Sequence, residues 1–391
     1  MRHLYKLVLV LFCSPVLVYV CLSLTESTDI FTNVHKTIFL KRTSSQVKLS
    51  FNWKFWQSID TLSEITGTTF EQLVGGENHS TILSTCGHLV RSLWDGRLGS
   101  QMFVYASFYG MAKEQEMQGA NKTAYIQVSQ IPSSLDYVFE NLTTPRKVLN
   151  DSFLISNDFV PLMETKCCTF DNNGLKDLRC DGKNYYVAGY RTNYRYFSAF
   201  ADEVKREFIF KQHIREKALK LLNRTLTPSN DLNRANSILV GVHLRRGDFS
   251  FPEKIEYGHW PASRDYLKKS LRLFETVFLD YNNSTQKKNL VFLIFGNDYE
   301  WNKNVSKSII LKHPNHTRLI LTNSKTSSPA VDLCAMSMCD HMIISTGTFS
   351  WWAGFFSPGL VTYQKEFARP GSSLYEEFNV EEYFPESWIA L

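Results

Sequence analysis

The stretch Val240-Gly241-Val242-His243-Leu244-Arg245-Arg246-Gly247-Asp248-Phe249 begins as an apolar run and ends in two adjacent arginines, a glycine and an aspartate. Core packing does not account for two guanidinium groups at the carboxyl end of a buried strand. Parallel sheets bind ligands at that edge, and the planar donors of Arg match a diphosphate better than Lys does. The motif predicts a phosphate site. A solvated surface turn is the plain alternative, and an adhesion tripeptide, Arg246-Gly247-Asp248, would leave the preceding strand unexplained.

Length and composition indicate a packed protein with room for two domains. The chain has 391 residues, of which 43% are hydrophobic and 14% aromatic. These values allow a sizeable core and argue against a disordered chain. The net charge of +5 is small for this length and is spread along the chain, so nucleic acid is not the expected partner. A local anion site fits better.

Leu7 to Leu24 is an uncharged stretch of 18 residues, preceded by Arg2 and Lys6 and followed by Glu26 and Asp29. It reaches the lower limit for a helix that crosses a bilayer, and the preceding positive charges favour a cytosolic amino terminus. We therefore expect a cytoplasmic tail (1–6), a transmembrane signal anchor (7–24) and a stem (25–85). A cleaved signal peptide is the alternative, but the stretch is long for one and lacks an Ala-x-Ala-like end.

Glycosylation sequons and cysteines agree with a chain that faces the lumen. Asn-x-Ser/Thr sequons occur at Asn78, Asn121, Asn141, Asn150, Asn223, Asn282, Asn283, Asn304 and Asn315. Together with the expected anchor, they predict surface loops that can carry glycans. The expected lumenal part contains Cys86, Cys167, Cys168, Cys180, Cys334 and Cys339. An oxidising compartment permits disulfides, and six cysteines allow fifteen full pairings, which the sequence leaves open.

The rest of the chain divides into an expected amino-terminal domain (86–228) and an expected carboxyl-terminal domain (229–391). Glu203 to Leu222 predicts an amphipathic helix with a basic outer face, which bridges the two. In the second domain, apolar strands alternate with helices, which implies a parallel sheet covered on both faces and a Rossmann-type nucleotide domain. The expected strands are Ile238–Leu244, Asn289–Phe295, Arg318–Leu321 and Met342–Ser345, and the clearest expected helix is Arg264–Phe278.

Two further segments combine glycines or hydroxyls with the start of a helix. Gly96-Arg97-Leu98-Gly99-Ser100-Gln101-Met102 suits an anion or sugar near a helix amino terminus, although such glycines also serve tight turns. Ser345-Thr346-Gly347-Thr348-Phe349-Ser350-Trp351-Trp352 follows an apolar strand and places donors where an anionic oxygen can bind. We interpret its two tryptophans as core residues rather than a stacking platform. Asp332, before an expected helix Leu333–Met338, is either a helix cap or an acceptor for a guanine edge.

These motifs together resemble the galactoside alpha-1,2-fucosyltransferase family. The resemblance runs from about Asp95 to Gly359. It rests on the two segments above, on Gly241 to Asp248, and on the patches Gly189-Tyr190, Arg206-Glu207-Phe208 and His213-Ile214-Arg215-Glu216. It implies a type II Golgi membrane enzyme, a hexosyltransferase, with a GT-B-like α/β fold of two Rossmann-type domains. Its donor would be GDP-fucose and its acceptor a terminal beta-galactose. Ser100 stands where the family usually has Asn, and Ser350 where it often has Gly.

The resemblance also implies roles for individual residues. Arg245 and Arg246 would bind the diphosphate, and His243 and Asp332 would contact the guanosine. Phosphate oxygens would be held by Ser345, Thr346, Gly347 and Thr348. The early loop, on the acceptor or donor side, contributes Gly96, Arg97, Gly99 and Gln101.

The expected chemistry needs stabilised negative charge on GDP and a base for the acceptor hydroxyl. Arginines and helix-end donors can stabilise the charge; since the sequence contains no Asp-x-Asp, we expect metal independence and no cofactor. Asp248 is the first candidate for the base and Glu253 the second. Asp248 alternatively orients an arginine.

Two other functions remain open at this stage. The enzyme could transfer fucose to a different hexose or to a protein hydroxyl. The chain could also be a non-catalytic, glycan-binding membrane glycoprotein, although its arginine motif is intact.

Overall fold

The computed structural model describes residues 7–13, 16–22, 86–93, 96–149, 158–172, 175–176, 178–227, 232–280, 288–322 and 327–391. The chain forms two units, Met1–Gly76 and Glu77–Leu391. The predicted stem (25–85) lies outside the described residues.

The amino-terminal unit contains two strands where the sequence predicts an anchor helix. The strands β1 (Leu7–Cys13) and β2 (Val16–Leu22) pair antiparallel, with Leu7 opposite Leu22. Proline and β-branched valines favour this outcome, because Pro15 lacks the N–H that a continuing helix needs and valine prefers strands. Nowhere in the described part of the chain is a helix both long and apolar enough to cross a membrane.

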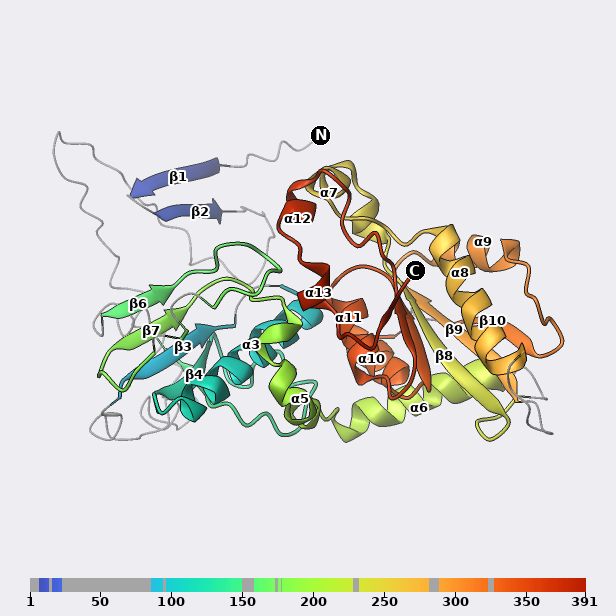
Figure 1. The fold of residues 1–391 in the computed structure, drawn as a ribbon, viewed down its shortest axis with the longest axis horizontal. Coiled ribbons are helices and arrows are strands. Elements are labelled where there is room, and N and C mark those ends of the chain that lie inside the picture. Colours follow the sequence, from blue (N-terminus) through green and yellow to red (C-terminus); the bar gives the residue numbers. More distant parts are fainter. Residues whose placement is uncertain are drawn as a thin grey trace, which may run out of the picture. The chain divides into compact units, whose positions relative to one another are not determined.

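The first half of Glu77–Leu391 builds a parallel sheet of five strands in the order β5-β4-β3-β7-β6. The strands are β3 (His88–Ser92), β4 (Thr123–Val128), β5 (Arg146–Val148), β6 (Phe159–Leu162) and β7 (Asn184–Val187). The helix α3 (Leu98–Met117) connects β3 to β4 and runs beside the sheet (Figure 1). Apolar residues surround most of this helix, which is why it is buried along much of its length.

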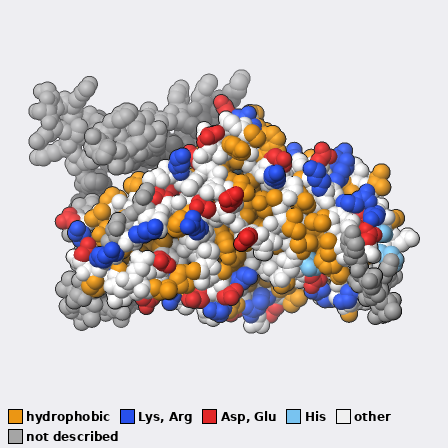
Figure 2. Space-filling model, viewed as in Figure 1, with side chains coloured by type: hydrophobic (Ala, Val, Ile, Leu, Met, Phe, Trp, Pro, Cys, Tyr) orange, Lys and Arg blue, Asp and Glu red, His pale blue; other side chains and the backbone are white. Residues whose placement is uncertain are grey.

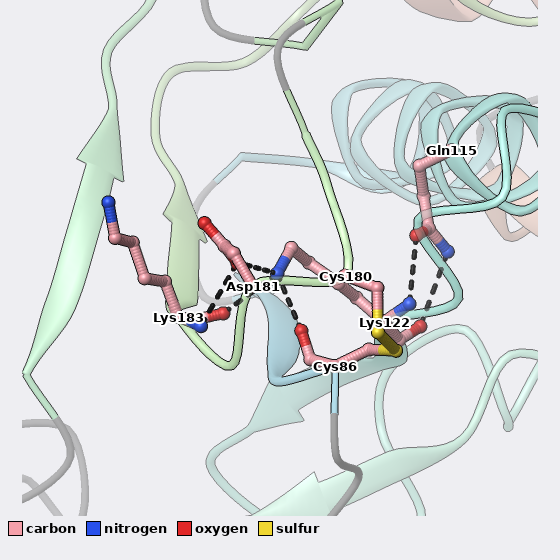
Figure 3. Close-up of a disulfide and its surroundings, with 6 residues drawn as sticks. All are labelled: Cys86, Gln115, Lys122, Cys180, Asp181 and Lys183. Atoms are coloured by element: carbon pink, nitrogen blue, oxygen red, sulfur yellow. Dashed lines mark hydrogen bonds and ion pairs between the residues drawn. A yellow bond between two sulfur atoms is a disulfide. The ribbon is translucent and has the colours of Figure 1, made fainter.

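A disulfide ties the starts of two neighbouring strands of this sheet. Cys86 precedes β3 and Cys180 precedes β7, and the two are bonded (Figure 3). Beside them the buried Lys122 ammonium donates to the Cys86 carbonyl at 2.6 Å and to the Asp181 carboxylate at 2.8 Å. The sequence had left this pairing open.

The second half builds a parallel sheet of six strands in the order β10-β9-β8-β11-β12-β13. The strands are β8 (Ser237–Leu244), β9 (Asn289–Gly296), β10 (Thr317–Leu321), β11 (His341–Ile344), β12 (Val361–Tyr363) and β13 (Ile389–Ala390). Numbered along the chain, this is the order 3-2-1-4-5-6 of dinucleotide-binding Rossmann sheets, whose ligands bind where the strand order reverses. In this sheet the reversal falls between β8 and β11.

The helices expected at Arg264–Phe278 and Leu333–Met338 are both present, although the second begins earlier, at Pro329. The helices of the second half are α7 (Pro252–Tyr257), α8 (Arg264–Glu275), α9 (Tyr299–Ser308), α10 (Pro329–Ser337), α11 (Thr348–Phe356), α12 (Ser373–Glu376) and α13 (Val380–Tyr383). Short helical turns are η1 (Tyr194–Tyr196), η2 (Ser198–Phe200), η3 (Gly247–Ser250) and the π-helical η4 (Thr276–Asp280). The α/β class with two parallel sheets is therefore as predicted.

The expected single helix over Glu203–Leu222 is wrong. The structure has two helices there, α5 (Ala201–Glu207) and α6 (Gln212–Leu226). Between them Phe210 forms an antiparallel bridge with Phe139. The buried Glu207 carboxylate accepts hydrogen bonds from the Tyr105 hydroxyl at 2.5 Å and the Thr143 hydroxyl at 2.6 Å. These long-range contacts outweigh the local periodicity.

Aromatic residues of α11 join the two halves. Trp351 and Trp352 are fully buried, and their rings lie 4.7 and 5.1 Å from that of Phe103 on α3. The Trp352 indole also donates to the carbonyl of Gly99 at 2.9 Å. The interpretation of both tryptophans as core residues is confirmed. All strands of the five-stranded sheet precede residue 228 and all strands of the six-stranded sheet follow it, but the domain limits stay a prediction.

Charged side chains of both signs are interspersed over the surface face in Figure 2. The described sequon asparagines, Asn121, Asn141, Asn223, Asn304 and Asn315, are all exposed. The others, Asn78, Asn150, Asn282 and Asn283, lie outside the described residues.

Candidate functional site

A cavity of about 820 Å³ lies at the carboxyl ends of β8 and β11, where the order of the second sheet reverses. We refer to it as the switch-point cavity. It brings together residues that the sequence predicted from four separate segments. These are Gly96, Arg97, Gly99, Gln101, His243, Arg245, Asp332, Thr346, Gly347 and Thr348.

Two helix amino termini meet in this cavity. The helix α11 begins at Thr348 after Gly347, whose φ is 94°, and α3 begins at Leu98. The Thr348 hydroxyl lies 3.4 Å from that of Ser100 on α3. A Cβ at Gly99 would be 2.6 Å from the backbone nitrogen of Phe349, so only glycine allows this approach. First-turn N–H groups have no partner within their own helix, and they and the helix dipoles favour an anion here.

The structure separates the two adjacent arginines. Arg245 lines the cavity, with its guanidinium 2.6 Å from Asp248 and over the ring of Phe249. Arg246 does not line it. Its guanidinium donates to the carbonyl of Ala262 at 2.6 Å and lies 4.4 Å from the centre of the Trp301 ring. Both arginines follow the end of β8, and the chain turns at Arg246, where φ is −134° and ψ is −99°. The motif therefore presents one guanidinium to the cavity.

Asp248 is held by two guanidinium groups. Its carboxylate lies 2.5 Å from Arg97 and 2.6 Å from Arg245. Burial by itself would raise the pKa of Asp248, but the two arginines outweigh it and lower the pKa below its ordinary value. Glu253, the second candidate for the base, is exposed in the first turn of α7 and does not line the cavity.

The hydroxyls after β11 differ in what they can offer a ligand. Ser345 is buried outside the cavity lining, and its hydroxyl oxygen accepts a hydrogen bond from the backbone of Arg245 at 2.7 Å. Thr346 lines the cavity, but its hydroxyl donates to the carbonyl of Trp260 at 2.9 Å. Both hydroxyls therefore fix the loop. Thr348 and the backbone of the first α11 turn are the donors that face the cavity.

His243 is a neutral side chain with a defined tautomer. Its Nδ1 lies 2.6 Å from the hydroxyl of Ser350, which itself donates to the carbonyl of Thr346 at 2.9 Å. Because the single hydroxyl proton is used there, Nδ1 must be the donor and Nε2 the acceptor. Burial, aided by Arg245, lowers the pKa of His243 to about 3. His243 therefore lines the cavity as an uncharged side chain whose Nε2 can accept a hydrogen bond.

Asp332 is not a helix cap. The cap of α10 is Ser328, whose hydroxyl accepts from the backbone of Val331, and Asp332 lies inside the first turn. Burial raises the pKa of Asp332 to about 6. Its Oδ1 is buried and has no hydrogen-bond partner among the described residues. An acceptor left in this state next to a cavity fits a ligand that brings hydrogen-bond donors.

Comparison with known proteins identifies the family. Residues 88–391 match Glycosyl transferase family 11. The chain belongs to this family. Bos taurus "Galactoside 2-alpha-L-fucosyltransferase SEC1" is 28% identical over 298 residues, covering 76% of this chain and 72% of the relative. Bos taurus "Galactoside alpha-(1,2)-fucosyltransferase 2" is 28% identical over 299 residues, covering 76% and 77%. The resemblance drawn from the motifs is confirmed, and the chain is a glycosyltransferase.

Solved structures of fucosyltransferases are distantly similar. A mutant of Arabidopsis thaliana FUT1 in complex with GDP has a TM-score of 0.45 and 10% identity, covering 82% of this chain and 81% of that one. Fucosyltransferase NodZ from Bradyrhizobium has a TM-score of 0.39 and 12% identity, covering 70% and 94%.

Several residues that line the cavity of this family 11 glycosyltransferase were missed from the sequence. They include Phe249, Asn297, Ser134, Ser327, Ser328 and Phe349. Asn297 carried a usable signal, because it follows β9, the strand next to β8. Its side chain accepts from the backbone of Arg246 at 3.0 Å and thereby supports the arginine turn. Within the described ranges, no group of three or more His, Cys, Asp or Glu side chains is placed to hold a metal ion, and metal independence stays a prediction.

Proposed function

We propose that the protein transfers L-fucose from GDP-fucose to a terminal beta-galactose, in alpha-1,2 linkage, by a metal-independent inverting mechanism. One observation carries this proposal: the lining of the switch-point cavity combines groups that attract anions with groups that accept hydrogen bonds. Arg245 and two helix amino termini attract anions, and Asp332, whose buried Oδ1 has no partner among the described residues, accepts hydrogen bonds. A guanosine diphosphate has matching parts, because its phosphates are anionic and its guanine edge donates hydrogen bonds. The names of the relatives supply the fucosyl group and the galactoside acceptor.

The mechanism follows from these positions. The bond from fucose C1 to the phosphate oxygen breaks, a bond from C1 to the acceptor oxygen forms on the opposite face, and GDP leaves with added negative charge. Arg245 and the first turn of α11 stabilise that charge, each contributing about 2 to 4 kcal/mol in the transition state. The acceptor hydroxyl loses its proton to a base, for which Asp248 stays the first candidate and Glu253 the second.

The same proposal places the enzyme in the Golgi membrane as a single-pass type II protein with a lumenal catalytic part. The uncharged stretch Leu7 to Leu24, with positive charges before it, supports an anchor, although the structure has strands there. The Cys86–Cys180 disulfide and the exposed sequons support an oxidising, glycan-bearing compartment. Protease protection in sealed microsomes tests it: the catalytic part should be protected and lose mass with an endoglycosidase.

Transfer of labelled fucose from GDP-fucose to a panel of beta-galactosides, by the full-length protein in detergent and EDTA, tests the activity. We expect turnover in EDTA and a product with an alpha-1,2 linkage. A different linkage would point to another acceptor hydroxyl, and absence of turnover on every galactoside would contradict the proposal.

The separated arginines provide a matched pair of variants. Arg245→Ala should abolish measurable GDP binding, because Arg245 faces the cavity. Arg246→Ala should weaken binding only indirectly, because that guanidinium packs against Trp301. Calorimetric titration with GDP measures both. Equal loss in the two variants would contradict the assigned orientation.

A further inference from the structure

In the five-stranded sheet, β3 and β7 are neighbours although they are far apart in the chain. From β3 the chain adds β4 and β5 on one side and then crosses to the other side, where β6 forms the edge and β7 lies beside β3. Open parallel sheets bind ligands outside the carboxyl ends of their strands. A cavity of about 190 Å³ lies there, lined by Arg91 and Ser92 of β3 and by Tyr186, Gly189 and Tyr190 of β7 and its following loop. We refer to it as the β3–β7 cavity.

Arg91 has hydrogen-bond donors available in this cavity. It is buried, with 9% of its surface exposed. Its guanidinium donates to the carbonyl of Gly189 and interacts with the hydroxyl of Tyr186. Among the described residues, no carboxylate lies within ion-pair distance of Arg91, although the charge of Glu164 attracts it electrostatically over a longer distance. A guanidinium has five N–H donors, so Arg91 can still bind an oxygen-rich ligand.

The neighbouring Arg191 shows what a structural arginine looks like in this region. It is almost fully buried, at 1% exposure. Its guanidinium donates to the carbonyls of Ala188, Asp171 and Leu162 and to the hydroxyl of Tyr196. Arg191 does not line the cavity. Structural support therefore accounts for Arg191 but not for the position of Arg91 against an open space.

Tyr190 connects the β3–β7 cavity to the switch-point cavity. Its side chain is 41% exposed, and one ring carbon lies 3.6 Å from where a Cβ of Gly96 would be. Gly96 lines the switch-point cavity. Glu164 holds the Tyr190 loop, because its carboxylate accepts from the backbones of Tyr190 and Arg191. An occupant of the smaller cavity therefore lies near the switch-point cavity, with Tyr190 between the two.

We propose that the β3–β7 cavity binds the terminal neutral hexopyranose of the acceptor, with Arg91 donating to sugar hydroxyls and the ring of Tyr190 packing against the sugar's apolar face. The Tyr186 hydroxyl donates to Ser92 at 3.0 Å and the Ser92 hydroxyl donates to Gln127 at 2.8 Å. Each hydroxyl has a single proton, so both oxygens can only accept hydrogen bonds from a ligand, which suits the hydroxyls of a neutral sugar better than an anion. The cavity is much smaller than the switch-point cavity, at about 190 against 820 Å³, so a nucleotide does not fit it. The inference rests on the proposed function for the identity of the reaction.

Two variants of the full-length enzyme test this site. Tyr190→Ala and Arg91→Gln should each raise the KM for phenyl beta-D-galactoside at least about tenfold, equivalent to about 1.4 kcal/mol. Their affinity for GDP and the KM for GDP-fucose should change less than about twofold, since neither side chain lines the switch-point cavity. Tyr375→Ala is the matched control, because Tyr375 is a comparably exposed tyrosine that lines neither cavity.

Direct binding of phenyl beta-D-galactoside, measured by saturation-transfer NMR, separates failure of this inference from failure of the proposed function. Wild type should bind the galactoside and both variants should lose the signal, whether or not fucose is transferred. Galactoside binding that is unchanged in both variants would overturn the site. A wild-type protein that binds no neutral hexoside, with or without GDP, would also overturn it. An equal loss of GDP affinity in the variants would show that these residues serve the donor instead.

Discussion

The guanidinium of Arg97, in the loop before α3, lies 2.5 Å from the carboxylate of Asp248, which follows β8. This ion pair joins the two sheets at the edge of the switch-point cavity, and Arg245 completes it from the other side of the same carboxylate at 2.6 Å. Asp248 thus fixes two cationic groups where the donor phosphates are proposed to bind. A carboxylate with a lowered pKa between two arginines is a weak proton acceptor.

Replacement of Asp248 by Asn separates the positioning role from the base role. If Asp248 orients the arginines, Asp248→Asn should raise the KM for GDP-fucose about tenfold and leave the acidic limb of the kcat profile in place. Loss of a general base would instead lower kcat by about 10² to 10⁴ and abolish that limb. Steady-state kinetics as a function of pH distinguish the two.

Asp340→Asn is the control for this experiment. Asp340 also pairs with an arginine, Arg234, at 2.5 Å, but Arg234 does not line the switch-point cavity, whereas both arginine partners of Asp248 do. The kinetic constants of Asp340→Asn should stay close to those of wild type. A similar rise in donor KM would mean that the effect reflects stability and not the site.

Asp332→Asn should improve stability and impair binding. The folded protein raises the pKa of Asp332 to about 6 from 3.8, so this group favours the folded state at low pH and the advantage is lost as the pH rises through 6. At neutral pH the variant removes a buried charge whose Oδ1 has no hydrogen-bond partner among the described residues, and its melting temperature should increase. GDP affinity should fall by about 1.5 to 3 kcal/mol, the range for a hydrogen bond to a charged group.

Two measurements complete this test. Wild-type GDP affinity should rise with pH through 6 as Asp332 ionises, and the variant should lack that rise. The preference for GDP over ADP should shrink in the variant, since the guanine edge has lost its charged acceptor. If the preference for GDP over ADP is unchanged in the variant, Asp332 does not contact the guanine.

Much of this site was predictable because it follows local rules. Apolar runs that end in polar residues place their side chains at one edge of a parallel sheet, and so β8 and β11 deliver His243, Arg245 and Thr348 together. The sequence did not predict that only Arg245, and not Arg246, lines the cavity. This difference depends on the turn at Arg246, where φ is −134° and ψ is −99°, and on a partner ring, Trp301, from α9.

Long-range pairing was the other part that the sequence left undetermined. The Cys86–Cys180 disulfide requires β3 and β7 to be neighbours, and that order is set by the packing of the whole sheet. The break between α5 and α6 likewise depends on Phe139, far away in sequence. Periodicity records which face of a segment is apolar, but not which distant residue interrupts it.

Gly99→Ala tests the contact between the two helix amino termini. The added Cβ would lie 2.6 Å from the backbone nitrogen of Phe349, and backbone on both sides leaves little room to yield. We expect a loss of about 1 to 3 kcal/mol in the free energy of unfolding together with weaker GDP binding. Gly119→Ala is the control, because Gly119 has a φ of +77° and nothing within 4 Å of its added Cβ. Gly119→Ala should lower the free energy of unfolding but leave GDP affinity unchanged. If both variants lose GDP affinity equally, the loss in Gly99→Ala does not come from the contact between the two helices.

His243 should make the protein less stable in mild acid. Burial lowers its pKa to about 3 from 6.5. Between pH 6.5 and pH 3, His243 is therefore protonated in the unfolded chain but stays neutral in the folded protein. The contribution of this group is complete above pH 6.5 and is lost as the pH falls toward 3, at about 1.4 kcal/mol per pH unit. Denaturant unfolding of wild type and His243→Gln across this range should show the difference between them shrinking at that rate. Parallel stability curves would mean that His243 gains a proton in the folded protein, and the neutral acceptor inferred from its hydrogen bond to Ser350 would have to be abandoned.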